Sequence, residues 1–163
     1  MPEQKTNVMR ILEQNSVKYK AVFYEWDGKN APDGETVARM TKLSPEQVFK
    51  TLVTKGASGA YYVFDIPVEH SLDFKKAARA VGEKSITMLP LKELFPLTGY
   101  VHGGCSPIGM KKSFPTVIDE SCILYDEIYV SAGRVGAQVE VSPGDLAALT
   151  GAILADVTVE GIG

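Results

Sequence analysis

Apolar residues recur at helical spacing in several short segments of the chain. In the first segment Val8, Ile11 and Leu12 follow the capping residue Thr6, which predicts an amphipathic helix that ends near Asn15. The same spacing predicts helices over residues 35–42, 73–81, 90–95 and 143–149. Ser44 precedes a proline and an acid, so we expect a further brief helix to begin there.

Other segments are rich in β-branched and aromatic residues and alternate as strands do. Residues 48–54 and 60–66 are separated by a glycine-rich turn, which predicts a hairpin. Further strands are expected over residues 17–24, 86–88, 100–102, 116–119, 128–131, 138–141 and 153–156. Strands outnumber helices and do not alternate regularly with them. We therefore expect an α+β fold with a mixed, curved, barrel-like sheet flanked by short helices.

Length and composition indicate one domain. The chain has 163 residues, of which 45% are hydrophobic, and no linker is longer than the loop over residues 27–34. The formal net charge of −3 excludes a disordered polyelectrolyte and a strongly basic nucleic-acid coat. Any RNA contact must then use a local patch. The candidates are Lys75, Lys76, Arg79, Lys84, Lys111 and Lys112.

Several classes of protein are not supported by the sequence. Its apolar runs are far shorter than the roughly 18 residues that a membrane-spanning helix needs, and no signal peptide is evident, so we expect a cytoplasmic protein without membrane contact. The cysteines, Cys105 and Cys122, show neither a CxxC motif nor histidines at ligand spacing. We expect no disulfide framework, no metal and no cofactor.

The segment 99–112 contains the most unusual motif of the chain. Gly103 and Gly104 lack a Cβ, so their peptide groups could approach a ligand and turn N–H groups toward an oxyanion. A plain turn is the alternative, and neither the Walker pattern nor the dinucleotide fingerprint occurs there. His102 and Cys105 invite comparison with a cysteine hydrolase. No Asp or Asn partner completes such a site.

Lys50 lies within a predicted strand whose two faces are each partly apolar around one polar residue, Lys50 on one face and Thr51 on the other. A lysine is costly to bury unless it meets an anion, which makes it a candidate to bind a phosphate, a carboxylate or a developing oxyanion. Alternatively it protects a strand at the sheet edge. Ser131 is a weaker candidate at the end of another strand, where a glycine-rich hairpin turn is the simpler interpretation.

Six segments of the chain carry a resemblance to a known family, namely Tyr24-Glu25, Gly34-Glu35-Thr36-Val37-Ala38, Val48-Phe49-Lys50-Thr51-Leu52, Leu72-Asp73-Phe74-Lys75-Lys76, Gly103-Gly104-Cys105-Ser106-Pro107-Ile108-Gly109 and Ile128-Tyr129-Val130-Ser131-Ala132-Gly133. In this order they resemble the YbaK/EbsC family of aminoacyl-tRNA deacylases, which are related to the insertion domain of bacterial prolyl-tRNA synthetases. The resemblance spans nearly the whole chain and implies one domain over residues 1–163. The implied activity is hydrolysis of mischarged tRNA, above all cysteinyl-tRNA(Pro), without metal or cofactor.

The resemblance also implies roles for particular residues. Lys50 corresponds to the family's essential lysine, while Gly103 and Gly104 belong to the loop that faces the scissile ester. The implied substrate-binding residues are Tyr24, Thr51, Ser106, Pro107, Ser131 and Gln138. In the similar cysteinyl enzymes the substrate's own thiol attacks its carbonyl carbon. Mischarged tRNA(Pro) and prolyl-tRNA synthetase are the implied partners.

Two positions differ from the pattern of that subfamily. Asp33 stands where an aromatic residue usually precedes Gly-Glu, and Gln138 stands where an aspartate commonly follows the Ser-Gly-Gly turn. Both bear on which amino acid is removed. Two alternatives follow, namely a deacylase for alanyl-tRNA(Pro) or another mischarged tRNA, and a non-catalytic module that docks to a synthetase or RNA. The presence of Lys50 argues against the second.

Overall fold

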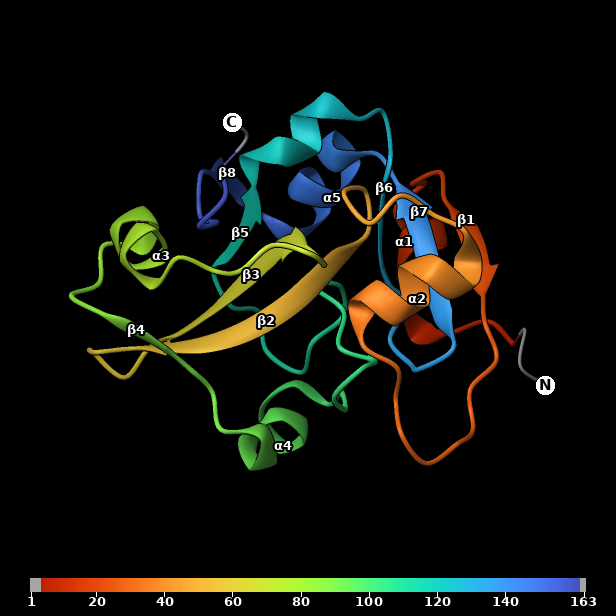
Figure 1. Ribbon diagram of the computed structural model, residues 1–163, viewed down its shortest axis with the longest axis horizontal. Coiled ribbons are helices and arrows are strands. Elements are labelled where there is room, and N and C mark those ends of the chain that lie inside the picture. The colour runs from red at the N-terminus through yellow and green to blue at the C-terminus, as the bar shows by residue number, and fades with distance from the viewer. Residues whose placement is uncertain (1–3, 162–163) are drawn as a thin grey trace.

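A computed structural model describes residues 4–161 of the chain (Figure 1). The helices are α1 (Asn7–Gln14), α2 (Gly34–Thr41), α3 (Phe74–Val81), α4 (Leu94–Thr98) and α5 (Pro143–Thr150), with short 3₁₀ helices η1 (Leu91–Glu93) and η2 (Glu120–Leu124). The strands are β1 (Lys20–Phe23), β2 (Phe49–Gly56), β3 (Tyr61–Pro67), β4 (Ile86–Met88), β5 (Thr116–Asp119), β6 (Ile128–Ser131), β7 (Ala137–Val141) and β8 (Ile153–Ala155). None of the helices in this part of the chain has the length and apolar character needed to cross a bilayer.

The strands form two hydrogen-bonded sheets. One has the order β1-β7-β6 and the other has the order β4-β2-β3-β5-β8. The pairs β3–β5 and β5–β8 are parallel, whereas the other neighbouring strands are antiparallel. A single parallel bridge between Val48 and Tyr129 joins the sheets where β2 begins. The expected α+β class and mixed pairing are confirmed, with the strands divided over two sheets.

Three of the apolar clusters that make up the core meet at β2, and a fourth, of Ala38, Val48 and Val68, lies beside α2. Helix α1 packs against β6 and β7 in the first cluster, which also takes in Phe49 of β2. Helix α3 packs against Phe64 and Ile66 of β3 in the second, with Leu52 at its margin. A third contains Val53 and Cys105. Strand β2, which runs across the middle of Figure 1, is therefore shared by all three clusters.

Capping residues explain where the helices begin and end. The Thr6 hydroxyl accepts a hydrogen bond from the Met9 amide at 3.3 Å, which starts α1 as the sequence predicts. Asp73 accepts bonds from the Lys75 and Lys76 amides, and Gly82 ends α3 in the left-handed conformation with a φ of 74°. Those two helices are thus fixed by local sequence.

Two expected elements are wrong. Residues 44–47 form only a turn, in which the Gln47 amide donates to the Ser44 carbonyl, because Val48 already enters the bridge to Tyr129. Residues 100–102 form no strand. The Tyr100 amide bonds to the Thr98 hydroxyl and the Gly104 amide bonds to the Val101 carbonyl, so this backbone is folded into turns.

Candidate active site

A cavity of about 430 Å³ opens beside the first half of β2. Its walls come from the loop before α2, from β2, from the segment that follows β4 and from the loop containing Gly103. Ends of β6 and β7 complete it through Ser131 and Gln138. The volume lies within the range of about 300–1,000 Å³ that is typical of small-molecule sites.

Most of the predicted site residues meet at this cavity. Those that line it are Tyr24, Lys50, Thr51, Gly103, Ser131 and Gln138. Gly104 does not line it, and a Cβ there would lie 2.9 Å from the Val135 amide nitrogen, so its small size serves close packing of the loop. Ser106 is fully buried and accepts a hydrogen bond from the Ile108 amide. Pro107 lines a separate cavity of about 140 Å³.

Lys50 is a half-buried cation in the cavity wall. Its Nζ donates to the Val68 carbonyl oxygen at 3.2 Å, and no carboxylate lies within ion-pair distance among residues 4–161. Burial lowers the pKa of Lys50, and the more distant charges of Glu35, Glu160 and Asp33 oppose that shift. An ammonium group has three hydrogens, and only one is donated to Val68 within residues 4–161. The others can be donated to an anionic or carbonyl ligand.

The edge of β2 along the cavity offers main-chain groups as well. The Val68 amide donates to the Val48 carbonyl, so residues 48, 50 and 52 direct their peptide groups toward β3. Residues 51 and 53 alternate with these and direct their peptide groups away from β3. The Val53 carbonyl shows this directly, because it accepts a hydrogen bond from the Leu89 amide on the other side of β2. Strand β4 pairs only with Thr54, Lys55 and Gly56. The Thr51 peptide group therefore lies on the open edge beside the cavity.

Behind Thr51 lies an acid that the sequence analysis missed. Asp65 is its cross-strand neighbour on β3, is fully buried, and accepts the Thr51 hydroxyl hydrogen at 2.5 Å. Burial raises the pKa of Asp65 to about 7, although the bond from Thr51 opposes this. The sequence does show an aspartate inside an apolar strand, but only the register of β2 and β3 shows that its side chain faces Thr51.

Cys105 and His102 also line the cavity. Burial and the nearby Asp65 raise the pKa of the Cys105 thiol to about 12, which leaves almost no thiolate at neutral pH. No hydrogen bond joins the two side chains anywhere in residues 4–161. No group of three His, Cys, Asp or Glu residues in that range is arranged to hold a metal ion.

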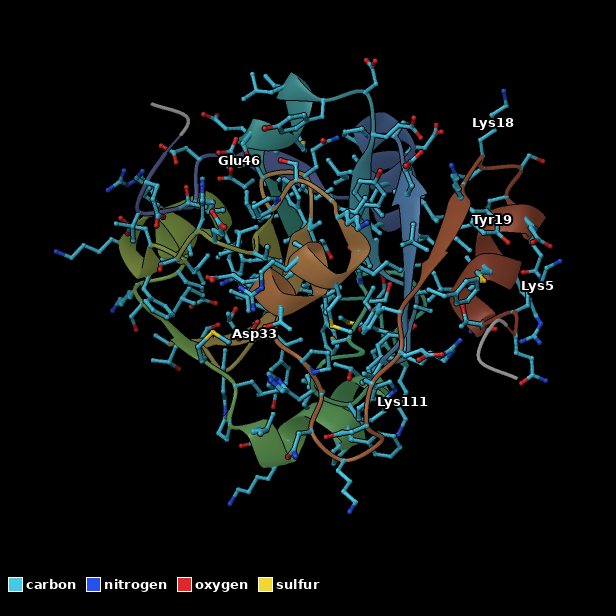
Figure 2. All side chains as sticks on the ribbon, turned by 45° about the vertical axis from the view of Figure 1, so that its right-hand side comes forward. Lys5, Lys18, Tyr19, Asp33, Glu46 and Lys111 are labelled. Atoms are coloured by element: carbon cyan, nitrogen blue, oxygen red, sulfur yellow. The ribbon has the colours of Figure 1, made fainter. Side chains whose placement is uncertain are left out.

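The two positions that differ from the family pattern both face the cavity. Asp33 caps α2 by accepting from the Thr36 amide at 2.7 Å, and this bond lowers the pKa of its carboxyl group (Figure 2). Gln138 pairs with Ser131 across β6 and β7, and its buried Oε1 has no hydrogen-bond partner within residues 4–161. An orphaned acceptor beside a cavity is available to a ligand.

Basic residues near the site differ in how freely they can bind. Lys76, in one candidate patch, already contacts Asp156 at 3.0 Å and donates to the Thr158 carbonyl. Lys111, labelled in Figure 2, lies with its Nζ 5.4 Å from the ring centroid of Phe95 in α4 and donates to the Pro96 carbonyl at 3.5 Å. Unlike Lys76 it has no carboxylate partner in residues 4–161, and Leu94 of the same helix lines the cavity, so Lys111 is the better candidate for a phosphate contact.

Comparison with known proteins assigns the chain to a family. Residues 29–149 match the model of the aminoacyl-tRNA editing domain. An Enterococcus faecalis protein named "Putative Cys-tRNA(Pro)/Cys-tRNA(Cys) deacylase EbsC" is 44% identical over 156 residues, or 96% of this chain and 94% of the relative. A crystal structure titled "a putative trans-editing enzyme for prolyl tRNA synthetase" superposes with a TM-score of 0.80 at 28% identity, covering 95% of this chain and 99% of the other. The fold also matches hypothetical protein APE2540 with a TM-score of 0.83 at 23% identity, over 94% and 99% of the two chains. The chain therefore belongs to the aminoacyl-tRNA editing family, in its YbaK/EbsC branch.

Proposed function

We propose that this chain hydrolyses the ester bond of mischarged tRNA, with Cys-tRNA(Pro) as its main substrate. The observation that carries the proposal is Lys50, a half-buried ammonium group with no carboxylate partner in residues 4–161, in the wall of a cavity of about 430 Å³. The related Enterococcus protein is named for this substrate class. A site of this size suits an amino acid and the terminal nucleoside that carries it.

The geometry favours catalysis by orientation and by charge stabilisation. An aminoacyl ester is already activated, so hydrogen-bond donors fixed at its carbonyl oxygen and a held conformation supply much of the acceleration. Lys50 and the open-edge amide of Thr51 are the donors we assign to the developing oxyanion. Gly103 lets the opposite wall come close, since a Cβ there would lie 2.6 Å from the Cβ of Ala31.

The nucleophile that we assign comes from the substrate. The protonated Cys105 thiol is a poor nucleophile, and His102 has no orienting hydrogen bond within residues 4–161. The thiol of the cysteinyl group instead attacks its own carbonyl carbon. The carbon–sulfur bond forms, the ester bond to the ribose oxygen breaks, and the thiol proton ends on that oxygen. A cyclic thiolactone leaves and is hydrolysed by water.

This chemistry separates amino acids more strongly than binding can. Cysteine, serine and alanine differ by one or two atoms, and such differences change binding by only about 1–3 kcal/mol. Serine has a far less acidic hydroxyl and alanine has no nucleophile. The pocket can thus be selective without a close steric fit, and we place the reaction in the cytoplasm with tRNA as the partner. Prolyl-tRNA synthetase is the protein partner that we propose, because it would supply the identity of the tRNA.

A deacylation assay over matched substrates tests the proposal. We expect Cys-tRNA(Pro) to be cleared at least about 1,000-fold faster than Ser-tRNA(Pro) or Ala-tRNA(Pro), which is about 4 kcal/mol and exceeds what binding alone supplies. An added amine or thiol should trap the thiolactone as a cysteinyl amide or thioester. Equal rates for the alanyl ester would indicate alanine editing by water or a ribose hydroxyl. Binding without turnover of any substrate would indicate a non-catalytic module.

A further inference from the structure

Thr51 and Asp65 form a two-layer polar cluster at the cavity. Thr51 lines the cavity, whereas Asp65 lies behind it with no exposed surface. Their side chains share one face of the β2–β3 hairpin because the two residues are cross-strand partners. Asp65 therefore contacts a ligand only through Thr51.

The direction of the hydrogen bond decides what Thr51 offers to a ligand. A hydroxyl group has one hydrogen and two lone pairs, and an ionised carboxylate can only accept. With Asp65 ionised, the hydrogen of Thr51 is committed to the 2.5 Å bond, and only lone pairs remain for the cavity. With Asp65 protonated, the acid can donate to Thr51, and the Thr51 hydrogen is free to turn toward the cavity. Thr51 is thus an acceptor in one state and a donor in the other.

The remaining contacts of Asp65 leave its charge uncompensated. Its Oδ2 is buried without a hydrogen-bond partner in residues 4–161, and the Cys105 thiol, whose pKa Asp65 helps to raise, brings no positive charge. A lone buried carboxylate is costly, and a cation in the adjacent cavity would offset that cost through the low-dielectric interior. The other titratable side chains that line the cavity are Tyr24, Asp33, Glu35, Lys50 and His102.

We propose that Asp65 is a positioning residue that holds the Thr51 hydroxyl as an acceptor for the free α-ammonium group of the aminoacyl ester. This inference deepens the proposed function and rests on it. An α-ammonium group is favoured over a ribose hydroxyl as the partner, because only a charged donor gains from the carboxylate behind Thr51. The site then selects esters with a free amino group and disfavours N-acylated ones, which carry neither the charge nor the same donors.

The test compares Cys-tRNA(Pro) with N-acetyl-Cys-tRNA(Pro), which keeps the thiol and the ester. We expect the native protein to cleave the free-amine substrate about 10- to 100-fold faster, as fits a hydrogen bond to a charged group. Asp65→Asn and Thr51→Val should each remove most of this preference, and the double variant should lose no more than either single variant. Thr51→Ser should retain the preference.

Thr54→Val provides the matched control. Thr54 is buried on the same strand, and its hydroxyl bonds to the Tyr62 carbonyl, but it does not line the cavity. We expect it to leave the preference unchanged even if stability falls. The pH dependence gives a second readout. As pH rises through about 7, the native carboxylate becomes ionised whereas asparagine stays neutral, so the kcat/KM of the native protein should increasingly exceed that of Asp65→Asn.

The possible failures are distinguishable. A native protein that cleaves no aminoacyl-tRNA contradicts the proposed function, and the role of Asp65 falls with it. An active native protein that cleaves both esters equally contradicts the role of Asp65 alone. So does a double variant in which the losses multiply, since Asp65 would then act independently of Thr51. If Asp65→Asn fails to fold, equal preferences in Thr51→Val and Thr51→Ser overturn the proposal.

Discussion

Lys50 is the residue whose removal should separate activity from folding. Its side chain is half-buried and, within residues 4–161, forms one hydrogen bond, to the Val68 carbonyl, so its removal strands no buried carboxylate there. We expect Lys50→Ala to reduce kcat/KM for Cys-tRNA(Pro) at least about 100-fold, the usual effect of losing an oxyanion donor. The free energy of unfolding should change by less than about 1 kcal/mol.

Lys55 gives a control for that prediction on the same strand. It is exposed, lies over the ring of Tyr61 and does not line the cavity, whose last residue on β2 is Val53. Lys55→Ala should leave deacylation unchanged, as measured by release of labelled cysteine. Full activity of Lys50→Ala, or loss of its fold in thermal unfolding, would show that Lys50 has another role.

Cys105 should be dispensable as a nucleophile although it lines the cavity. Its thiol has a pKa of about 12, so a reaction through it would need the rare thiolate. We expect Cys105→Ser to keep kcat within about tenfold of the native value. A loss of more than a hundredfold, roughly 2.7 kcal/mol of barrier, would restore the cysteine-hydrolase interpretation.

Asp65 should give the stability of the protein a distinctive pH dependence. Its pKa is about 7 in the folded state and near the ordinary value of 3.8 in the unfolded chain. The folded state then holds the proton more tightly, so this contribution to stability is fully present below about pH 4 and is lost as pH rises to about 7. The shift corresponds to a contribution on the order of 4 kcal/mol. Urea unfolding of Asp65→Asn should show a smaller fall in stability between pH 5 and pH 8 than the native protein; an equal fall would contradict the assignment.

At the scale of elements, local signals predict the hairpin and the capped helices well. The glycine-rich turn over residues 56–59 and the Asp73 cap act within a few residues, so sequence alone places β2, β3 and α3. The contact between Thr51 and Asp65 depends on strand register, and the turn at residues 100–104 depends on tertiary hydrogen bonds. Such non-local features of the site could not be predicted from the pattern.

The loop at Gly103 offers a test at this scale. Gly103 has a φ of 87°, and a Cβ there would lie 2.6 Å from Ala31 in the loop before α2. Gly103→Ala should therefore displace the cavity wall, raise KM and lower kcat together, and cost about 1–3 kcal/mol of stability. Gly144→Ala is the control, because a Cβ there meets nothing within 4 Å in helix α5. Assays and urea unfolding of both variants measure the difference; unchanged kinetics in Gly103→Ala would show that this wall does not shape the site.

On the scale of the whole molecule, recognition should concentrate on the aminoacyl end of the tRNA. The protein is acidic overall, with a net charge of −3, and Lys76 is already engaged with Asp156. Lys111 lies over Phe95 and has no carboxylate partner in residues 4–161, so it is the basic group that we assign to a phosphate contact. With only one or two phosphate contacts, kcat/KM should fall no more than about 3- to 12-fold between 50 and 200 mM salt.

That weak hold implies little discrimination between tRNA bodies. We expect Cys-tRNA(Pro) and Cys-tRNA(Cys) to be deacylated by the isolated protein at rates within about tenfold of each other, because a cavity of about 430 Å³ has room only for the aminoacyl end that both share. Lys111→Ala should raise KM for both by the same few-fold factor and flatten the salt dependence by about one charge. Lys18 provides the control, because Figure 2 shows it near β1 and away from α4. Lys18→Ala should change neither KM nor the salt dependence. A steep salt dependence, or a hundredfold preference for one tRNA without a partner protein, would show that this chain reads the tRNA body itself.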